Sequence, residues 1–285
     1  MAWRMAPTAP KVLLAAPGIS AHHDAGLYWL AALSRQGIST VVWDYRVEPQ
    51  PPATDYSLAL VLKGETVDPE ILKRPRVVYW PDDPSRTPGI WEQLKKYDLV
   101  ACPVPNLKDA LWLPTSYDPL VHRPLPTMIK RSVVFCGTWT DRKQRFMQAL
   151  MEAGLLLSRN LYGNGWEEVS AWIRPVYATE YVLVLSSASI SVNVHRADIG
   201  VNRRLFESIA CTFTLTDLVP GVREILGAEL AEKVGFSTPE ELVKKVEHYL
   251  SSPERDALWE QEKRAIAPYT YDAALGCILE KLSLT

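Results

Sequence analysis

The stretch that decides the fold class is residues 11–43, KVLLAAPGISAHHDAGLYWLAALSRQGISTVVW. Short apolar runs bounded by Pro and Gly are typical of buried strands, and apolar residues at a spacing of three and four indicate an amphipathic helix. The stretch contains, in order, a strand pattern, a helix pattern and a second strand pattern: Lys11 to Ala16, Ala25 to Leu33, and Ser39 to Trp43. It therefore predicts a βαβ unit, the building block of parallel sheets.

Further short aliphatic runs continue this plan toward the middle of the chain. They are Leu58 to Leu62, Val77 to Trp80 and Leu99 to Ala101. Periodicity then disappears and prolines accumulate between Ser116 and Lys130, as is typical of a connection between domains. We therefore predict an N-terminal Rossmann-like domain over residues 1–125 and a C-terminal one over 126–285.

The alternation of strand and helix patterns starts again after this connection. The predicted elements are Ser132 to Cys136, Asp141 to Ala153, Asn160 to Tyr162, Glu180 to Ser186, Ile190 to Val194, Arg203 to Ala210 and Thr212 to Thr216. Thr238-Pro239-Glu240-Glu241 is a capping box that predicts a helix start, and Ser252-Pro253 predicts another. The last predicted helix, Asp272 to Leu282, is expected to cross back to the first domain.

Composition narrows the classes of function. The chain is 47% hydrophobic and 22% charged with a net charge of −2, as in globular proteins, and neither half is basic, which counts weakly against a nucleic-acid partner. No segment is long and apolar enough for a membrane span, and no signal-peptide core precedes residue 11, so we expect a cytoplasmic protein. The four cysteines have no metal-binding spacing and are expected to be reduced.

Nucleotide chemistry is expected at the loops that follow the strands, because open α/β sheets bind ligands at the carboxyl ends of their strands. Neither a GxGxxG nor a GxxxxGK[ST] motif occurs, which disfavours a dinucleotide oxidoreductase and a P-loop enzyme. Residues 137–143, GTWTDRK, join a predicted strand to a predicted helix. Their backbone amides, with Arg142 or Lys143 nearby, are a candidate diphosphate site.

A second polar segment, residues 191–207, follows a later strand: SVNVHRADIGVNRRLFE. A carboxylate such as Glu207 can accept hydrogen bonds from both ribose hydroxyls, and arginine can bind a diphosphate with two donors. The residues of this segment that we select as candidate ligands of a nucleotide are Asn193, His195, Asn202, Arg204 and Glu207. The alternative is an Arg204–Glu207 pair that serves only the helix surface.

At these residues the chain resembles the CgeB-like (spore-maturation-type) glycosyltransferases, whose pattern is close to N-x-R-x-FE-x-x-A-C/G. Asn202, Arg204, Phe206, Glu207, Ala210 and Cys211 fit that pattern. Four further stretches are similar to family motifs in order and spacing: residues 135–138, FCGT; residues 161–166, LYGNGW; residues 82–84, DDP; and the stretch from Leu113-Pro114 to His122-Arg123-Pro124. The resemblance covers nearly the whole chain.

The resemblance implies an α/β protein with the GT-B fold, in which two doubly wound Rossmann-like domains face each other across a cleft. It implies that Glu207 binds the ribose and Arg204 the diphosphate of a nucleotide sugar. Gly137 and Thr138 would line the phosphate side, and Tyr162 and Gly163, within the stretch Tyr162 to Gly165, the base side. No metal or other cofactor is expected, because amides and basic side chains can stabilise the leaving diphosphate.

The chain departs from its relatives at three places. Related retaining enzymes have a second Glu eight residues before the ribose-binding one, where this chain has Ile199, so the stereochemical outcome stays open. After the short helix, where the family usually has Gly, this chain has Thr212. Where the family has a late His-Thr-Tyr followed by Arg, this chain has Tyr269-Thr270-Tyr271 and lacks the Arg. If the reaction is inverting, a general base must come from the first domain, where the candidates are His22, His23, Asp24, Asp82 and Asp83.

The leading functional hypothesis is transfer of a sugar, a hexose, from a uridine diphosphate sugar to a hydroxyl acceptor, which could be a glycan, a protein, a small molecule or modified DNA. A DNA glycosyltransferase acting on a hydroxymethylated base is the first alternative, and clustering of Arg74, Arg76, Lys95 and Lys96 would favour it. An alternative of another class is a non-catalytic nucleotide-sugar-binding protein, motivated by Ile199. An oxidoreductase or epimerase is disfavoured by the missing glycine motif.

Overall fold

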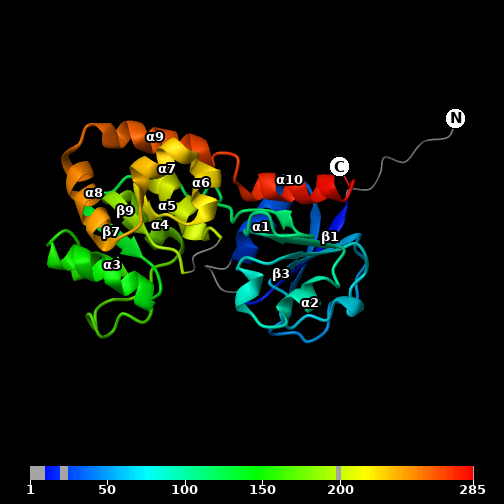
Figure 1. Cartoon of the computed structure of the whole chain (residues 1–285). Coiled ribbons are helices and arrows are strands. Elements are labelled where there is room, and N and C mark those ends of the chain that lie inside the picture. Colours follow the sequence, from blue (N-terminus) through cyan, green and yellow to red (C-terminus); the bar gives the residue numbers. More distant parts are fainter. Residues whose placement is uncertain (1–9, 20–24, 197–199, 285) are drawn as a thin grey trace. The chain divides into compact units, whose positions relative to one another are not determined.

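A computed structural model describes residues 10–19, 25–196 and 200–284 of the chain (Figure 1). The chain divides into two compact units, of which the first comprises residues 1–114 and 271–285 and the second residues 115–270. Each unit contains one parallel β-sheet covered by helices. This is the doubly wound α/β architecture that the opening βαβ pattern predicts.

The first unit is built on a six-stranded sheet in the order β2-β1-β3-β4-β5-β6. All of its pairings are parallel, and β1 lies between β2 and β3. The strands are β1 (Lys11–Ala16), β2 (Ser39–Asp44), β3 (Leu58–Leu62), β4 (Arg76–Tyr79), β5 (Leu99–Cys102) and β6 (Leu111–Trp112). The first five were predicted to within one residue at each end; the two-residue β6 was not.

Alternate residues of β1 enter the cores on the two faces of this sheet, as strand geometry requires. Val12, Leu14 and Ala16 pack on one face with helix α1 (Ala25–Arg35), while Leu13 and Ala15 pack on the other. The remaining helical segments of the unit are η1 (Pro69–Ile71), η2 (Pro84–Arg86), α2 (Ile90–Leu94) and α10 (Tyr271–Lys281). Both faces are therefore covered, which explains why the strands are continuously apolar.

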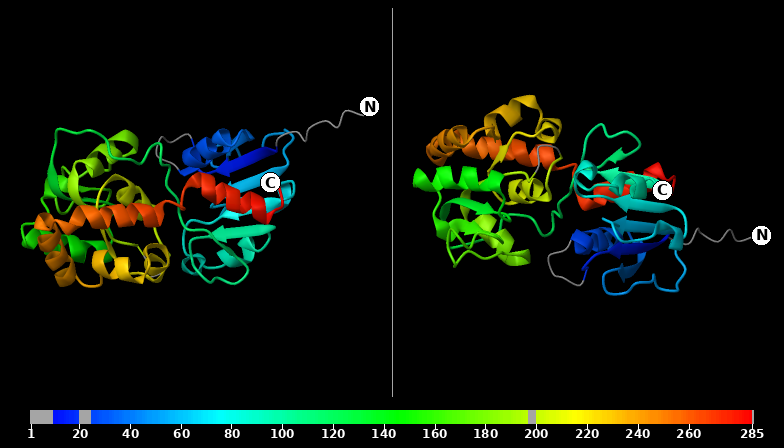
Figure 2. Two further views of the ribbon diagram at one scale, coloured as in Figure 1. Left: turned by 90° about the horizontal axis from the view of Figure 1, so that it is seen from above. Right: turned by 60° about the horizontal axis from the view of Figure 1, so that its bottom comes forward.

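The terminal helix α10 packs against α1 in the first unit, and two views show the pair from other directions (Figure 2). Tyr28 and Tyr271 stack with ring centroids 5.5 Å apart. Arg35 Nε donates to Asp272 Oδ1 over 2.9 Å, so an ion pair reinforces the apolar contact. The predicted return of the last helix to the first part of the chain agrees with this packing.

The second unit is built on a five-stranded parallel sheet in the order β11-β10-β9-β7-β8. The strands are β7 (Arg131–Cys136), β8 (Leu161–Tyr162), β9 (Ala188–Asn193), β10 (Thr214–Asp217) and β11 (Gly235–Phe236). The helical segments are α3 (Asp141–Glu152), η3 (Ser158–Asn160), α4 (Ala178–Ser186), α5 (Arg203–Cys211), α6 (Pro220–Leu226), α7 (Ala228–Val234), α8 (Pro239–Ser251) and α9 (Glu254–Ile266). The strand order reverses between β7 and β9, and such a switch point opens a crevice for ligands.

Side-chain caps fix the starts of three helices in this unit. Thr140 accepts from the amide of Lys143 over 3.3 Å at the start of α3, and Asn202 accepts from the amide of Leu205 over 3.1 Å at the start of α5. Thr238 accepts from the amide of Glu241, as the capping box predicts, while the Glu241 carboxylate accepts from the amide of Ser237 rather than Thr238. The caps of α3 and α5 orient the helix N-termini that border the candidate site.

One carboxyl group is buried in the core of the second unit. Glu262 of α9 is 0% exposed, and its Oε2 accepts from the amide of Thr214 at the start of β10 over 3.1 Å. Its Oε1 is buried without a hydrogen-bond partner among the described residues. Burial raises the pKa of Glu262 well above its usual value, so this side chain is held in the uncharged form.

The boundary between the units lies earlier than the predicted one at residue 125. The second unit begins at Thr115, because the proline-rich segment is hydrogen-bonded into it. Thr115 Oγ1 donates to the carbonyl of Val201 over 2.9 Å, and the amide of Tyr117 donates to the carbonyl of Tyr269 over 3.2 Å.

None of the helices among the described residues has the length and apolar character needed to cross a membrane.

Candidate functional site

The candidate site lies at the carboxyl edge of the second sheet, where the loops after β7 and β8 are fastened together. Trp166 Nε1 donates to the carbonyl of Gly137 over 2.7 Å, and the amide of Gly137 donates to the carbonyl of Tyr162 over 2.8 Å. Gly163 has φ +148°, and a Cβ added there would lie 2.0 Å from the carbonyl oxygen of Gly137. Only glycine allows these two loops to approach so closely.

These loops and the start of α5 enclose a pocket. It is lined by Cys136, Gly137, Thr138, Tyr162, Gly163, Asn164, Pro175, Val176, Tyr177 and Arg204. Five of the predicted donor-binding residues are thus brought together, namely Gly137, Thr138, Tyr162, Gly163 and Arg204. Backbone amides, aromatic rings and one guanidinium are the groups that a nucleotide diphosphate requires.

Arg204 is the charged group of this pocket, and its side chain is half-buried. Its guanidinium carbon lies 5.2 Å from the centroid of the Tyr181 ring, a cation–π distance. No hydrogen bond or ion pair reaches the guanidinium from the described part of the chain. Arg204 therefore carries five N–H donors that are available to an anionic ligand.

Lys143 contacts the Gly137–Thr138 loop, and its side chain is buried. Its Nζ donates to the carbonyl of Thr138 over 3.0 Å. Burial lowers the pKa of Lys143 to about 8, and the positive charges of Arg204 and Arg196 contribute to the same shift. Several cations therefore meet around this loop with incomplete compensation, as expected for an anion site.

Glu207 projects from α5 and is 2% exposed. Its Oε1 lies 2.8 Å from Arg203 Nε and 3.5 Å from His122 Nε2. Burial alone would raise the pKa of Glu207, but Arg203, His122 and Arg204 outweigh burial and hold it below its usual value. The side chain is therefore an ionised hydrogen-bond acceptor at neutral pH, but the pair with Arg203 shows that its position also has a structural role.

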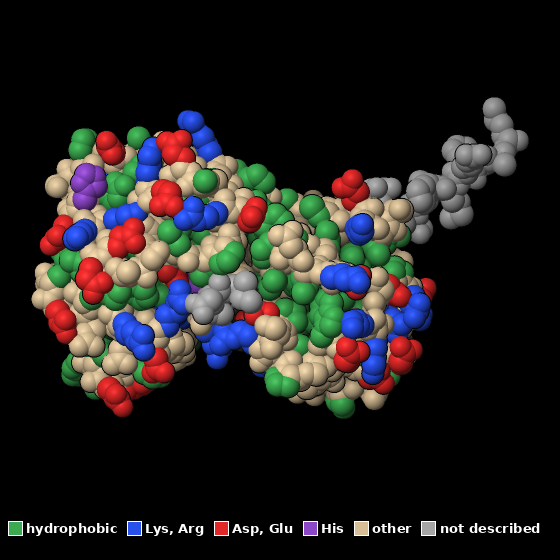
Figure 3. Space-filling model, viewed as in Figure 1, with side chains coloured by type: hydrophobic (Ala, Val, Ile, Leu, Met, Phe, Trp, Pro, Cys, Tyr) green, Lys and Arg blue, Asp and Glu red, His purple; other side chains and the backbone are tan. Residues whose placement is uncertain are grey.

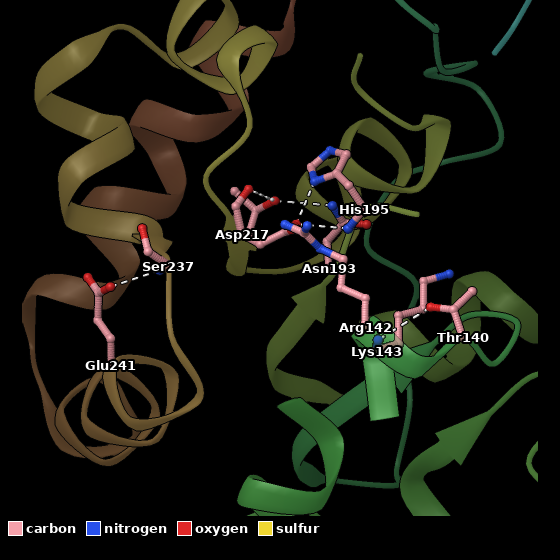
Figure 4. Close-up of polar contacts among 9 residues, drawn as sticks. Thr140, Arg142, Lys143, Asn193, His195, Asp217, Ser237 and Glu241 are labelled. Carbon is pink, nitrogen blue, oxygen red and sulfur yellow. Dashed lines mark hydrogen bonds and ion pairs between the residues drawn. The ribbon is translucent and has the colours of Figure 1, made fainter. Parts of the chain in front are cut away.

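A second buried carboxylate, Asp217 at the end of β10, connects three elements (Figure 4). Its Oδ2 accepts from Arg142 Nε and Nη2 over 3.1 and 2.8 Å, and its Oδ1 accepts from the backbone amide of His195 over 2.8 Å. His195 Nδ1 also lies 2.5 Å from Oδ1. Burial would raise the pKa of Asp217, but His195 and Arg142 hold it below its usual value.

The two asparagines among the candidates have partners within the protein. Asn193, the last residue of β9, donates from Nδ2 to Thr216 Oγ1 over 3.1 Å. Asn202 caps α5 through its side-chain oxygen. Each of them holds the edge of the site in place, and their contact with a nucleotide stays a prediction.

Of the five candidate bases of the first domain, Asp82 and Asp83 lie in the described part of the chain. Asp82 and Asp83 follow β4 in the first unit, and Asp82 is exposed. Asp83 caps η2, since its Oδ1 accepts from the amide of Ser85 over 2.9 Å and its Oδ2 from the hydroxyl of Ser85 over 2.8 Å. His22, His23 and Asp24, like Ile199, lie outside the described residues, so their predicted roles stay predictions.

Asp217 and His122 are site residues that the sequence pattern does not indicate. Asp217 ends the short strand β10 without any motif, and only the fold shows that its carboxylate meets His195 and Arg142. His122 belongs to the segment that resembles the family's interdomain motif, yet spacing alone could not place it beside Glu207. The sequence offers either Arg142 or Lys143 as a basic partner of the diphosphate. In the structure Arg142 donates to Asp217, while Lys143 donates to the carbonyl of Thr138 in the loop after β7.

Comparison with known proteins agrees with this geometry. Residues 142–280, which include Tyr162, Gly163, His195, Arg204 and Glu207 but not Gly137, Thr138 or His122, match the family model described as glycosyl transferase-like. No protein in a search of curated sequences matches the chain. The family match over residues 142–280 and the likeness of fold together support a GT-B glycosyltransferase.

Three solved structures illustrate the likeness of fold. Sucrose-phosphate synthase from Thermosynechococcus elongatus superposes with a TM-score of 0.67 at 13% identity, covering 97% of this chain and 99% of that one. HepE from Anabaena, solved with UDP and glucose, gives 0.67 at 12% identity over 97% and 100% of the chains. An α-glucosyltransferase in complex with UDP and a DNA 13-mer containing an HMU base gives 0.67 at 9% identity over 97% and 99%.

Proposed function

We propose that the chain transfers a hexose from a uridine diphosphate sugar to a hydroxyl acceptor, with the donor bound at the carboxyl edge of the second sheet. The observation that carries the proposal is Arg204, a guanidinium in a pocket of backbone loops with no hydrogen-bond partner in the described part of the chain. A diphosphate bound to Arg204 would also lie near Lys143, whose pKa is lowered by burial and by the positive charges of Arg204 and Arg196. Binding an anion would relieve the repulsion between these cations.

The remaining donor contacts follow from the position of the diphosphate. Glu207 is ionised and lies one helical turn beyond Arg204, so it is proposed to accept hydrogen bonds from the ribose hydroxyls. Tyr162, Gly163 and Tyr177 also line the pocket and are proposed to contact the base. The choice of uridine is supported by the UDP bound in the structures of HepE and of the α-glucosyltransferase.

We further propose that the transfer requires no divalent metal. Charge develops on the leaving diphosphate, and Arg204 with Lys143 would stabilise it through charge-assisted hydrogen bonds. Full activity in the presence of EDTA is the expected result. Loss of activity in EDTA that added Mg²⁺ or Mn²⁺ restores would contradict this part of the proposal.

The acceptor is proposed to bind to the first unit, and the sequence resemblance supports assignment to the CgeB-like enzymes. The first test is a thermal-shift screen against a panel of nucleoside diphosphates and nucleotide sugars, in which a binding ligand raises the midpoint of unfolding. Uridine compounds are expected to give the largest increase. A response to adenine or guanine nucleotides alone, or to none of the panel, would contradict the assignment of the donor.

A second assay separates an enzyme from a non-catalytic binding protein. Glycosyltransferases hydrolyse their donor slowly when no acceptor is present, so steady release of UDP from the donor found in the screen supports catalysis. A protein that binds the donor and releases no UDP, with or without a panel of acceptors, would support the non-catalytic alternative.

A cytoplasmic location also stays a proposal, which cell fractionation can test.

Modified DNA is the second candidate acceptor, favoured by the likeness of fold to the glucosyltransferase bound to HMU-containing DNA. The basic cluster considered from the sequence does not support it. Arg76 is 1% exposed, Arg74 lies 3.1 Å from Asp98, and Lys95 lies 3.0 Å from Glu92. Basic and acidic side chains are also interspersed on the face drawn in Figure 3. Transfer of radiolabelled sugar to DNA that contains 5-hydroxymethyluracil, compared with unmodified DNA, decides the question.

A further inference from the structure

Asp217 makes more hydrogen bonds with Arg142 and His195 than an ion pair alone requires. Asp217 is 1% exposed and uses both oxygens, one for the guanidinium of Arg142 and the other for the amide and ring of His195 (Figure 4). The charge of the carboxylate is already compensated by Arg142 over 2.8 Å. The additional bond to the imidazole adds to this compensation and also fixes the orientation of the His195 ring.

The imidazole of His195 has a defined proton on one nitrogen and an unused second nitrogen. Because Asp217 is an ionised acceptor 2.5 Å away, Nδ1 carries a hydrogen and donates it to Oδ1. The other nitrogen, Nε2, is buried and has no hydrogen-bond partner among the described residues, and the side chain is only 2% exposed. Buried polar atoms without partners are rare in native proteins, and they mark positions where a ligand completes the hydrogen bonding.

The surroundings of His195 indicate which ligand this is. His195 follows β9, the strand next to β7 at the switch point, and Arg142 is the neighbour of Lys143 at the start of α3. Lys143 Nζ donates to the carbonyl of Thr138, a residue that lines the pocket, so the start of α3, which carries Arg142, lies beside the proposed diphosphate site. An oxygen atom of the donor is therefore the group of suitable chemistry near Nε2.

We propose that His195 Nε2 makes a hydrogen bond to an oxygen of the nucleotide-sugar donor, and that Asp217 is a positioning residue that holds the imidazole for this contact. The inference rests on the proposed function of the same site. The oxygen belongs either to a sugar hydroxyl or to a phosphoryl group, since Nε2 can accept from the first and, when protonated, donate to the second. Arg142 supports the arrangement by fixing the other oxygen of Asp217.

The decisive variant is His195→Asn. The Asn amide can donate to Asp217 as Nδ1 does, but it has no atom in the place of Nε2, so the fold and the buried carboxylate are kept satisfied. His248→Asn is the matched control, because His248 is exposed on α8 of the same unit. Thermal unfolding of both variants close to that of the wild type is the condition for comparing their binding.

Isothermal titration with UDP and with UDP-glucose separates the two possible oxygens. Weakening of UDP-glucose binding by tenfold or more in His195→Asn, with UDP binding unchanged, supports a contact to the sugar. Weakening of both supports a contact to a phosphoryl oxygen. Unchanged affinity for both ligands in a wild type that binds them would overturn the inference alone, whereas a wild type that binds neither would overturn the proposed function with it.

The positioning role of Asp217 is tested by a double-mutant cycle with a spectroscopic signal. If Asp217 acts through His195, Asp217→Asn weakens binding of the same ligand, and the double variant is no weaker than His195→Asn alone. The ¹⁵N resonance of His195 Nε2 should shift when the bound ligand is added to the wild type, and Asp217→Asn should reduce that shift. Additive losses, or an Nε2 resonance that the ligand does not move, would contradict the role.

Discussion

Replacement of Arg204 by Gln tests the donor site most directly. Gln keeps most of the aliphatic stem and two N–H donors but removes the charge and the other three donors. A hydrogen bond to a charged partner contributes about 1.5–3 kcal/mol, and a diphosphate can engage one or two of the guanidinium bonds. We therefore expect Arg204→Gln to cost about 2–4 kcal/mol of UDP binding, roughly 30- to 1000-fold in Kd.

The same substitution should leave the free protein intact, and this separates a binding role from a structural one. No hydrogen bond from the described residues is lost and repulsion with Lys143 is relieved, whereas the cation–π contact with Tyr181 and the attraction of Glu207 are lost, so the midpoint of thermal unfolding should fall only slightly. Isothermal titration with UDP measures the affinity, and Arg145→Gln, an exposed residue of α3, is the matched control. A well-folded Arg204→Gln protein that binds UDP as tightly as the wild type would refute the reasoning.

Three further predictions concern the charges of the second unit. UDP affinity should fall as pH rises through about 8, because free Lys143 then loses the proton that the diphosphate needs; Lys143→Arg should flatten the profile in titrations between pH 7 and 9.5. Glu207→Gln should abolish the preference for UDP over 2′-deoxy-UDP, and a preserved preference would remove Glu207 from the ribose site. Glu262 has a folded-state pKa above its unfolded value, so its contribution to stability is complete below pH 4.5 and is lost as pH rises toward the raised pKa. Glu262→Gln should therefore unfold at a higher temperature than the wild type at pH 8 but not at pH 4, as measured by circular dichroism.

The regular elements could be predicted from the sequence because each one is set by a local pattern. Strand β3 matches its predicted range of Leu58 to Leu62, and the cap at Thr238 forms as the Thr-Pro-Glu-Glu motif indicates. The two-residue strands β6 and β11 were not predicted, since they carry no periodicity and pair only because a neighbouring strand is present. The equally short β8 was predicted, because Gly163 marks its end. The limit at Thr115 was missed for a related reason, as it depends on the hydrogen bond to Val201 far along the chain.

The candidate site was predictable where glycine, helix starts and charges coincide in sequence. Gly137, Gly163 and Arg204 do lie together around one pocket. The division of labour among the charges was not predictable, because it depends on which side chains are desolvated together. Arg142 and Lys143 are adjacent in sequence, yet the first neutralises Asp217 and the second is left with a lowered pKa.

The packing of α10 on α1 determines how the chain can be divided into fragments for expression. Both ends of the chain belong to the first unit, so the second is an uninterrupted insertion between Pro114 and Tyr271. Its two ends run side by side, since Tyr117 and Thr270 form a parallel β-bridge. Residues 115–270 can accordingly be expressed as one continuous fragment to isolate the nucleotide site, whereas the remaining piece would need an engineered link in place of the excised segment.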